Sequence, residues 1–103
     1  MSRKDVRYRI SSNQLAEMRL LLTAAVDRQA VIPAKYRAPA NQLAIAATPK
    51  QLRYMYDYYV RGLTMQDIAH GHGRHASAVS RGIDRGRYKA ECILRSQAGG
   101  QAG

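Results

Sequence analysis

Thr48-Pro49-Lys50-Gln51 begins the most complete set of helix signals in the chain. Thr48 is a suitable N-cap, and Pro49 stands at the first helical position, where its missing N–H costs no hydrogen bond. Gln51 follows the cap by three residues and can return a hydrogen bond to it, which makes a capping box. The pattern therefore predicts that a helix begins at Thr48.

Two further segments continue the pattern toward about Arg95: Gly62-Leu63-Thr64-Met65-Gln66-Asp67-Ile68-Ala69 and Ser77-Ala78-Val79-Ser80-Arg81. Gly62 can end the first helix in the left-handed conformation, and Thr64 with Asp67 forms a second capping box. This second helix has barely two turns before Gly73, which is placed to make a tight turn with positive φ. A third helix is expected to open near residues 75–77.

Apolar residues recur at helical spacing on the first and third of these helices. The two faces consist of Leu52, Met55, Tyr56, Tyr59 and Leu63, and of Val79, Ile83, Gly86, Ala90 and Ile93. A short helix, a glycine turn and a longer basic helix are the parts of a DNA-binding helix-turn-helix. The sequence therefore predicts an all-α fold with a helix-turn-helix over residues 48–95 and an additional N-terminal helix.

These motifs resemble the C-terminal DNA-binding region, region four, of bacterial sigma-70 family factors. The resemblance rests on Gly62-Leu63-Thr64, Asp67-Ile68-Ala69, Gly73 and Val79-Ser80-Arg81, followed by Arg85, Arg87 and Lys89. In that family the third helix reads promoter DNA in the major groove, and the domain can also contact RNA polymerase. Here His72 and Arg74 replace the usual aliphatic residues around the turn glycine, and His75 replaces the usual hydroxyl cap.

The third helix supplies the predicted base contacts. Val79 and Ile83 point inward, so the outward positions are Ala76, Ser77, Ser80, Arg81, Asp84 and Arg85. Arg81 is the best candidate for a bidentate contact to guanine, and Ala78 and Gly82 would leave room for a close approach. The predicted phosphate contacts are Arg61, Thr64, Met65, Gln66, Arg74, His75, Arg87 and Lys89.

Charge points to the same class of partner. The 103 residues carry 17 basic and 7 acidic side chains, a net charge of +10, which favours nucleic acid first and an anionic membrane surface second. Cys92 is the only cysteine, so one chain can form neither a disulfide nor a thiolate zinc site. The longest apolar run is far shorter than a membrane span needs. These features predict a cytoplasmic protein without a membrane partner.

The remaining segments are predicted from local patterns. Residues 1–10 form a basic N-terminal arm, 11–47 an N-terminal helical segment and linker, and 96–103 a disordered tail. Within 11–47 we expect a helix from about 13 to 31, a linker at 32–40 and a short helix near 40–47. The first of these helices has an apolar face made of Leu15, Met18, Leu22 and Val26. This face must be covered by the rest of the domain or by a second copy in a homodimer.

The tyrosines of the first motif helix and the three histidines are predicted to have no catalytic or metal-binding role. The spacing makes Tyr56 and Tyr59 core residues and places Tyr54 and Tyr58 at the flanks of the first motif helix. His70, His72 and His75 lack a spacing that zinc sites commonly use. No residues are arranged as a nucleophile or an acid–base couple. We therefore predict no catalytic residue, no metal, no cofactor and no enzymatic activity.

The leading hypothesis is sequence-specific binding of double-stranded DNA, as a transcription regulator or sigma-like accessory factor. A second hypothesis is a helix-turn-helix protein associated with RNA or a ribonucleoprotein. A third is the DNA-targeting module of a recombinase or transposase system.

Overall fold

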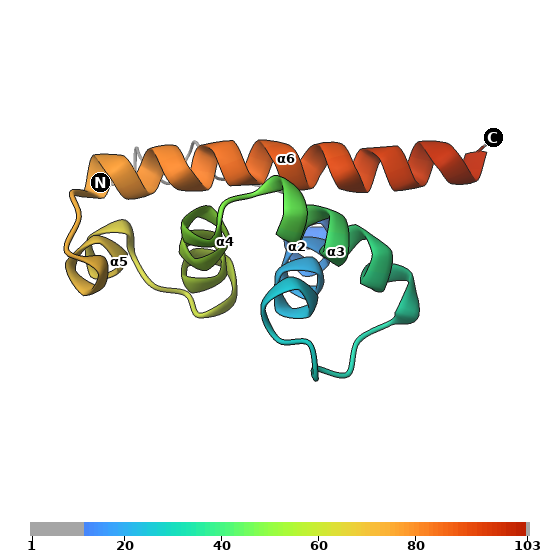
Figure 1. Ribbon diagram of the computed structural model, residues 1–103, viewed down its shortest axis with the longest axis horizontal. Helices are drawn as coiled ribbons and strands as arrows, with labels where there is room; N and C mark the ends of the chain where they lie inside the picture. Colours follow the sequence, from blue (N-terminus) through green and yellow to red (C-terminus); the bar gives the residue numbers. More distant parts are fainter. Residues whose placement is uncertain (1–11, 103) are drawn as a thin grey trace.

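The computed structural model describes residues 12–102, with the side chains of residues 12–96. Its described part is all helical (Figure 1). The elements in chain order are α2 (Ser12–Val26), the 3₁₀ turn η1 (Ala34–Tyr36), α3 (Arg37–Ala46), α4 (Pro49–Met55), the π-helical turn η2 (Tyr56–Val60), α5 (Met65–His72) and α6 (Ala76–Ala102). The predicted all-α class is confirmed, and the predicted basic arm at 1–10 lies outside the described residues.

Helix α6 lies along one side of the molecule, and the four shorter α-helices lie on its other side (Figure 1). It contacts α3, α4 and α5, while α2 packs on α3, α4 and η2. The inner face predicted for α6 is confirmed: Val79, Ile83, Gly86 and Ala90 are buried and Ile93 is half-buried. One side of α6 is thus covered along most of its described length.

The predicted helix boundaries around α4 and α5 are also confirmed. The Thr48 hydroxyl accepts from the Gln51 backbone N–H at 3.1 Å, and the Gln51 side chain accepts from the Thr48 N–H at 3.2 Å. Thr64 and Asp67 make the equivalent pair at 3.0 and 3.4 Å. Gly62 and Gly73 have φ angles of 75° and 64°, a region that glycine enters without steric cost.

The apolar face of α2 is covered within the chain. Met18 and Leu22 are buried against the core, and so is the neighbouring Leu21. Leu15 and Val26 are half-buried. A second copy of the chain is therefore not needed to remove this face from water.

The N-terminal segment differs from the predicted boundaries. α2 ends at Val26 rather than near residue 31, because Asp27 starts a turn in which its carboxylate accepts from the Gln29 N–H at 3.0 Å. The Arg37 guanidinium then donates to the carbonyls of Arg28 and Ala30. Helix α3 already begins at Arg37, inside the predicted linker, since a proline in the first turn costs no helical hydrogen bond.

The C-terminal boundary differs as well. Helix α6 continues through Ala102, so the backbone of residues 96–102, predicted to be a disordered tail, is helical.

A π-helical turn changes which tyrosines enter the core. The Arg61 N–H donates to the Tyr56 carbonyl, five residues earlier, and this wider turn brings residues five apart onto one face. Tyr54 and Tyr59 are buried, whereas Tyr56 and Tyr58 are half-buried. The prediction was therefore right for Tyr59 and Tyr58 and wrong for Tyr54 and Tyr56, because a regular 3.6-residue period was assumed.

Two glycines of α6 allow α4 to approach closely. A Cβ atom at Gly82 would lie 2.8 Å from the Tyr54 ring, and one at Gly86 would lie 2.7 Å from the end of the Met55 side chain. Gly82 was expected to leave room for an outside partner. It instead makes room for Tyr54 within the fold.

We expect Gly82→Ala to lower the free energy of unfolding by about 1–3 kcal/mol, because the Tyr54 ring must move. Gly71→Ala is the matched control, since Gly71 is helical and has open space around its Cβ position. That control should be neutral or stabilising by up to about 1 kcal/mol, through helix propensity. Denaturant unfolding measures both, and equal stability of the two variants would contradict the close α4–α6 contact.

Candidate nucleic-acid interface

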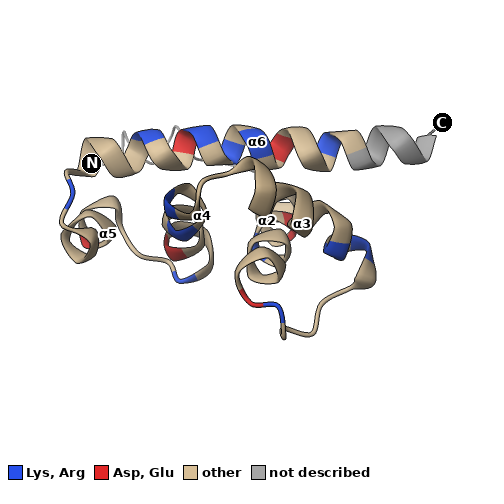
Figure 2. Ribbon diagram, in the orientation of Figure 1, with Lys and Arg blue, Asp and Glu red and all other residues tan. Residues whose placement is uncertain are grey.

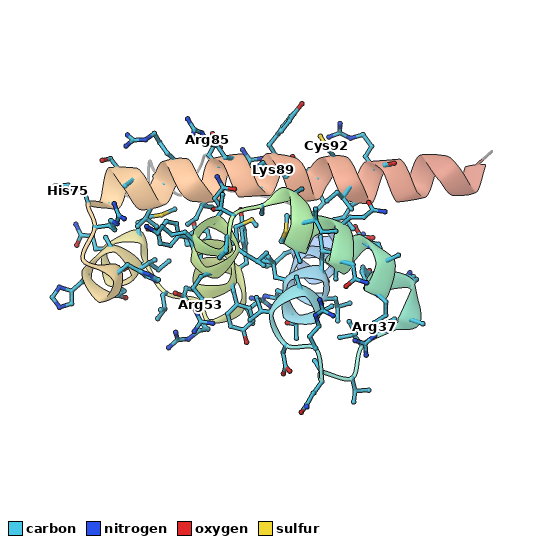
Figure 3. The ribbon with its side chains drawn as sticks, in the orientation of Figure 1. Arg37, Arg53, His75, Arg85, Lys89 and Cys92 are labelled. Carbon is cyan, nitrogen blue, oxygen red and sulfur yellow. The ribbon has the colours of Figure 1, made fainter. Side chains whose placement is uncertain are left out.

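The outer face of α6 carries polar and charged side chains (Figure 3). Basic residues recur along this helix, with acidic residues between them (Figure 2). We define this outer face of α6 by Ser77, Arg81, Arg85, Tyr88 and Arg95, which recur at helical spacing on the side opposite the core. All five are exposed, and in Figure 3 Arg85 points away from the body of the protein. Two expected base-contact residues fit this face less well, because Ala76 and Ser80 are half-buried.

The arginines of this outer face have no partner within the described part of the chain. Neither Arg81 nor Arg85 makes a hydrogen bond or an ion pair there, and the same holds for Arg95 and for Arg74 in the turn before α6. Asp84, the sixth expected base-contact residue, is exposed but paired with Arg87 at 2.8 Å. The face therefore presents unpaired arginines beside one carboxylate, Asp84, whose partner Arg87 also pairs with Glu91.

Arg87 and Lys89, two predicted phosphate contacts, have partners inside the protein. Arg87 bridges Asp84 and Glu91 at 2.8 and 3.0 Å. Burial alone would lower the pKa of Arg87, but the hydrogen bonds to these carboxylates outweigh it and raise the pKa above its usual value. Lys89 donates to the Ala46 carbonyl at 3.0 Å and to the Gln51 side chain at 3.1 Å, which ties α6 to α3 and α4.

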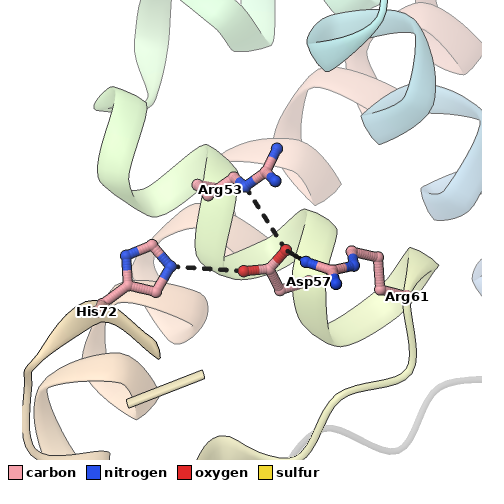
Figure 4. A network of polar contacts seen from close by, with 4 residues as sticks. All are labelled: Arg53, Asp57, Arg61 and His72. Carbon is pink, nitrogen blue, oxygen red and sulfur yellow. Dashed lines mark hydrogen bonds and ion pairs between the residues drawn. The ribbon is translucent and has the colours of Figure 1, made fainter. Parts of the chain in front are cut away.

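Arg61, a third predicted phosphate contact, belongs to a network around Asp57 (Figure 4). Asp57 is the buried charged residue of the described region, only 3% exposed. Its carboxylate meets Arg53 at 3.6 Å, Arg61 at 3.2 Å and His72 at 3.4 Å. The network joins α4 and η2 to the last residue of α5.

His72 stands at a turn position where the family that the motif resembles usually has an aliphatic residue. Its ring packs edge-on against Tyr54, with centroids 5.0 Å apart, and its Nε2 faces the Asp57 carboxylate. The side chain therefore combines ring packing with a polar contact. Arg74, on the other side of Gly73, is exposed.

The remaining predicted phosphate contacts lie at the starts of α5 and α6. Thr64 and Gln66 are exposed, whereas the Met65 side chain is buried, so Met65 can offer only its backbone N–H. The Asp67 N–H is already taken by the Thr64 hydroxyl. His75 is exposed just before α6, and its carbonyl accepts from Ala78 and Val79.

The buried position of Asp57 at the centre of this network was not predicted from the sequence. Its signal was present as the spacing of Arg53, Asp57 and Arg61, because residues four apart on a helix are neighbours. Its burial depends on the π turn and on the docking of α5, which that spacing does not show.

Within the described residues, no group of three histidine, cysteine or acidic side chains is placed to hold a metal ion. No described helix combines the length and apolar character that crossing a membrane requires. No family model matches the chain, and neither the curated proteins nor the solved structures gave a match. The likeness to sigma region four thus stays a prediction from the motif.

We expect Asp57→Asn to lower the free energy of unfolding by about 1–3 kcal/mol, because three polar partners lose a buried carboxylate. Asp84→Asn is the matched control, since Asp84 is about half-exposed and pairs with Arg87 alone, so its loss should cost less than about 1 kcal/mol. Thermal and denaturant unfolding measure both variants. An Asp57→Asn protein as stable as the control would show that the network does not hold α5 in place.

Proposed function

We propose that this protein binds double-stranded DNA sequence-specifically through the outer face of α6, as a transcription regulator or sigma-like accessory factor. The observation that carries the proposal is the presence of exposed arginines on this face without internal partners. Other cations, including Arg87 and Lys89, are hydrogen-bonded inside the fold. A net charge of +10 adds a general attraction to polyanions.

The N-terminal turns of α6 are the part that we assign to base recognition. In helix-turn-helix proteins this end of the recognition helix meets base edges in the major groove. Arg81 can donate a bidentate pair to guanine O6 and N7, and Ser77 can hydrogen-bond a base or a phosphate. Arg85, one turn further along, extends the same contact surface.

Phosphate contacts would then position the domain without specifying sequence. Arg74, in the turn before α6, and Gln66, at the start of α5, are exposed and suited to this role. Arg87 and Lys89 are instead assigned to holding α6 in its orientation, because a phosphate would have to compete with their present partners.

Duplex affinity should fall steeply with salt, because cations that neutralise phosphates release condensed counterions. We expect at least a tenfold, order-of-magnitude loss between about 50 and 200 mM salt. Fluorescence anisotropy with a labelled duplex measures the loss. A flat salt response would count against the DNA proposal, and tighter binding to RNA of the same length would favour the ribonucleoprotein hypothesis.

Arg81→Ala should cost about 1–3 kcal/mol of binding free energy on the preferred site, since a base contact carries discrimination. The loss on unrelated duplexes should be smaller. Selection from a random duplex pool supplies the preferred site, and anisotropy compares the two targets. Arg28→Ala is the control, because it removes the same charge from the exposed loop between α2 and η1. Equal losses for Arg81→Ala on both targets would assign Arg81 to phosphate and contradict this recognition register.

A further inference from the structure

A second group of cations lies on the opposite side of the molecule from the outer face of α6. Arg53 points away from α6, whereas Arg85 points outward on the far side of that helix (Figure 3). Arg61 lies beside Arg53, because both contact the same oxygen of Asp57. Lys50 is exposed one turn before Arg53 on α4. We call Lys50, Arg53 and Arg61 the α4 basic face.

The Asp57 carboxylate holds the two arginines of this face in place. Their side chains are 48% and 50% exposed, whereas that of Asp57 is 5% exposed beneath them. Arg53 uses its Nε and Arg61 one terminal nitrogen for this carboxylate. An arginine has five N–H donors, so each guanidinium keeps donors for an outside anion. One carboxylate cannot neutralise both arginines and Lys50, so the face retains positive charge.

The chemistry of this face suits a phosphate backbone better than a protein partner. Protein interfaces are centred on apolar or aromatic anchors that become buried. The large exposed apolar side chains of the described residues are Val31, Ile45 and Tyr88, and none of them belongs to α4 or η2. Arginines with fixed, outward donors match phosphate oxygens instead.

The two basic faces are far enough apart to hold separate duplexes. They lie on opposite sides of the packed α4 and α6 helices, since Arg53 points away from α6 and Arg85 points away from the body of the protein (Figure 3). At physiological salt the Debye length is about 8 Å, so two duplexes held across the protein would repel each other little. One straight duplex lying on α6 would not reach Arg53.

We propose that the α4 basic face binds the backbone of a second duplex segment, so that one protein molecule bridges two pieces of DNA. This inference rests on the proposed function, because the first segment is held by the outer face of α6. The second contact is to phosphate and is therefore independent of sequence.

The test measures whether the full-length chain brings two duplexes together. One short duplex is immobilised on beads, a second carries a fluorophore, and the fluorescence retained after adding protein is recorded. The test variant is Arg53→Gln/Arg61→Gln. Its control is Arg28→Gln/Lys35→Gln, which removes the same charge from the loop between α2 and α3. Anisotropy on a single duplex and light-scattering mass are measured for each protein.

The wild type and the control variant should retain the fluorescent second duplex. The test variant should retain at least about tenfold less of its fluorescence, while its affinity for a single duplex should change less than about threefold. Because this variant leaves Asp57 with His72 alone, a triple variant that adds Asp57→Asn removes the uncompensated carboxylate. If the test variant unfolds, the triple variant decides the result by the same criteria.

Single-duplex binding without retention by the wild type would overturn bridging and leave the proposed function standing. If the test variant retains as much of the second duplex as the wild type, bridging through the α4 basic face is overturned too. If the light-scattering mass is then twice that of one chain, bridging is assigned to a dimer. Absence of any duplex binding would overturn the proposed function itself.

Discussion

The inner face of α6 packs on α4 at a distance that leaves space only for glycine at two positions. Gly82 meets the Tyr54 ring and Gly86 meets Met55, while Val79 and Ile83 between the helices are fully buried. These contacts set the rotation of α6 about its own axis. Rotation by one residue position would bring a side chain against α4 in place of a glycine. The identity of the outward-facing residues is therefore a consequence of core packing.

Cations in this protein divide into those with internal partners and those without. Arg37 and Lys89 donate to backbone carbonyls that helix ends or turns leave open. Arg87 bridges two carboxylates on α6, and Asp57 orients two arginines on the opposite side of the protein. Arg81, Arg85 and Arg95 remain unpaired on the outer face of α6, where our functional proposal places the DNA. Counting basic residues alone would not separate these roles.

Local signals predicted the capped starts of α4 and α5 and the glycine turn after α5, because a cap depends on residues three or four positions apart. Thr48, Thr64 and Gly73 behave as their neighbours in sequence indicate. Features that depend on distant elements were missed or misplaced. The π turn brought Tyr54 into the core in place of Tyr56, and α4 occupied the space beside Gly82. The pairing of Arg87 with Asp84 and Glu91 was missed as well, although these partners lie only three and four residues away on α6. The outward position of Arg81 was predictable, since it follows from the periodicity of α6 itself.

The central claim, that the outer face of α6 meets duplex DNA, is tested most directly by titrating the ¹⁵N-labelled protein with its selected duplex. With the duplex kept substoichiometric, the tightest contact dominates the backbone amide shifts. The account predicts the largest changes in the first half of α6, around Ser77, Arg81 and Arg85, with α2 and α3 nearly unaffected. Large changes in α2 and α3 with an unaffected α6 would contradict it.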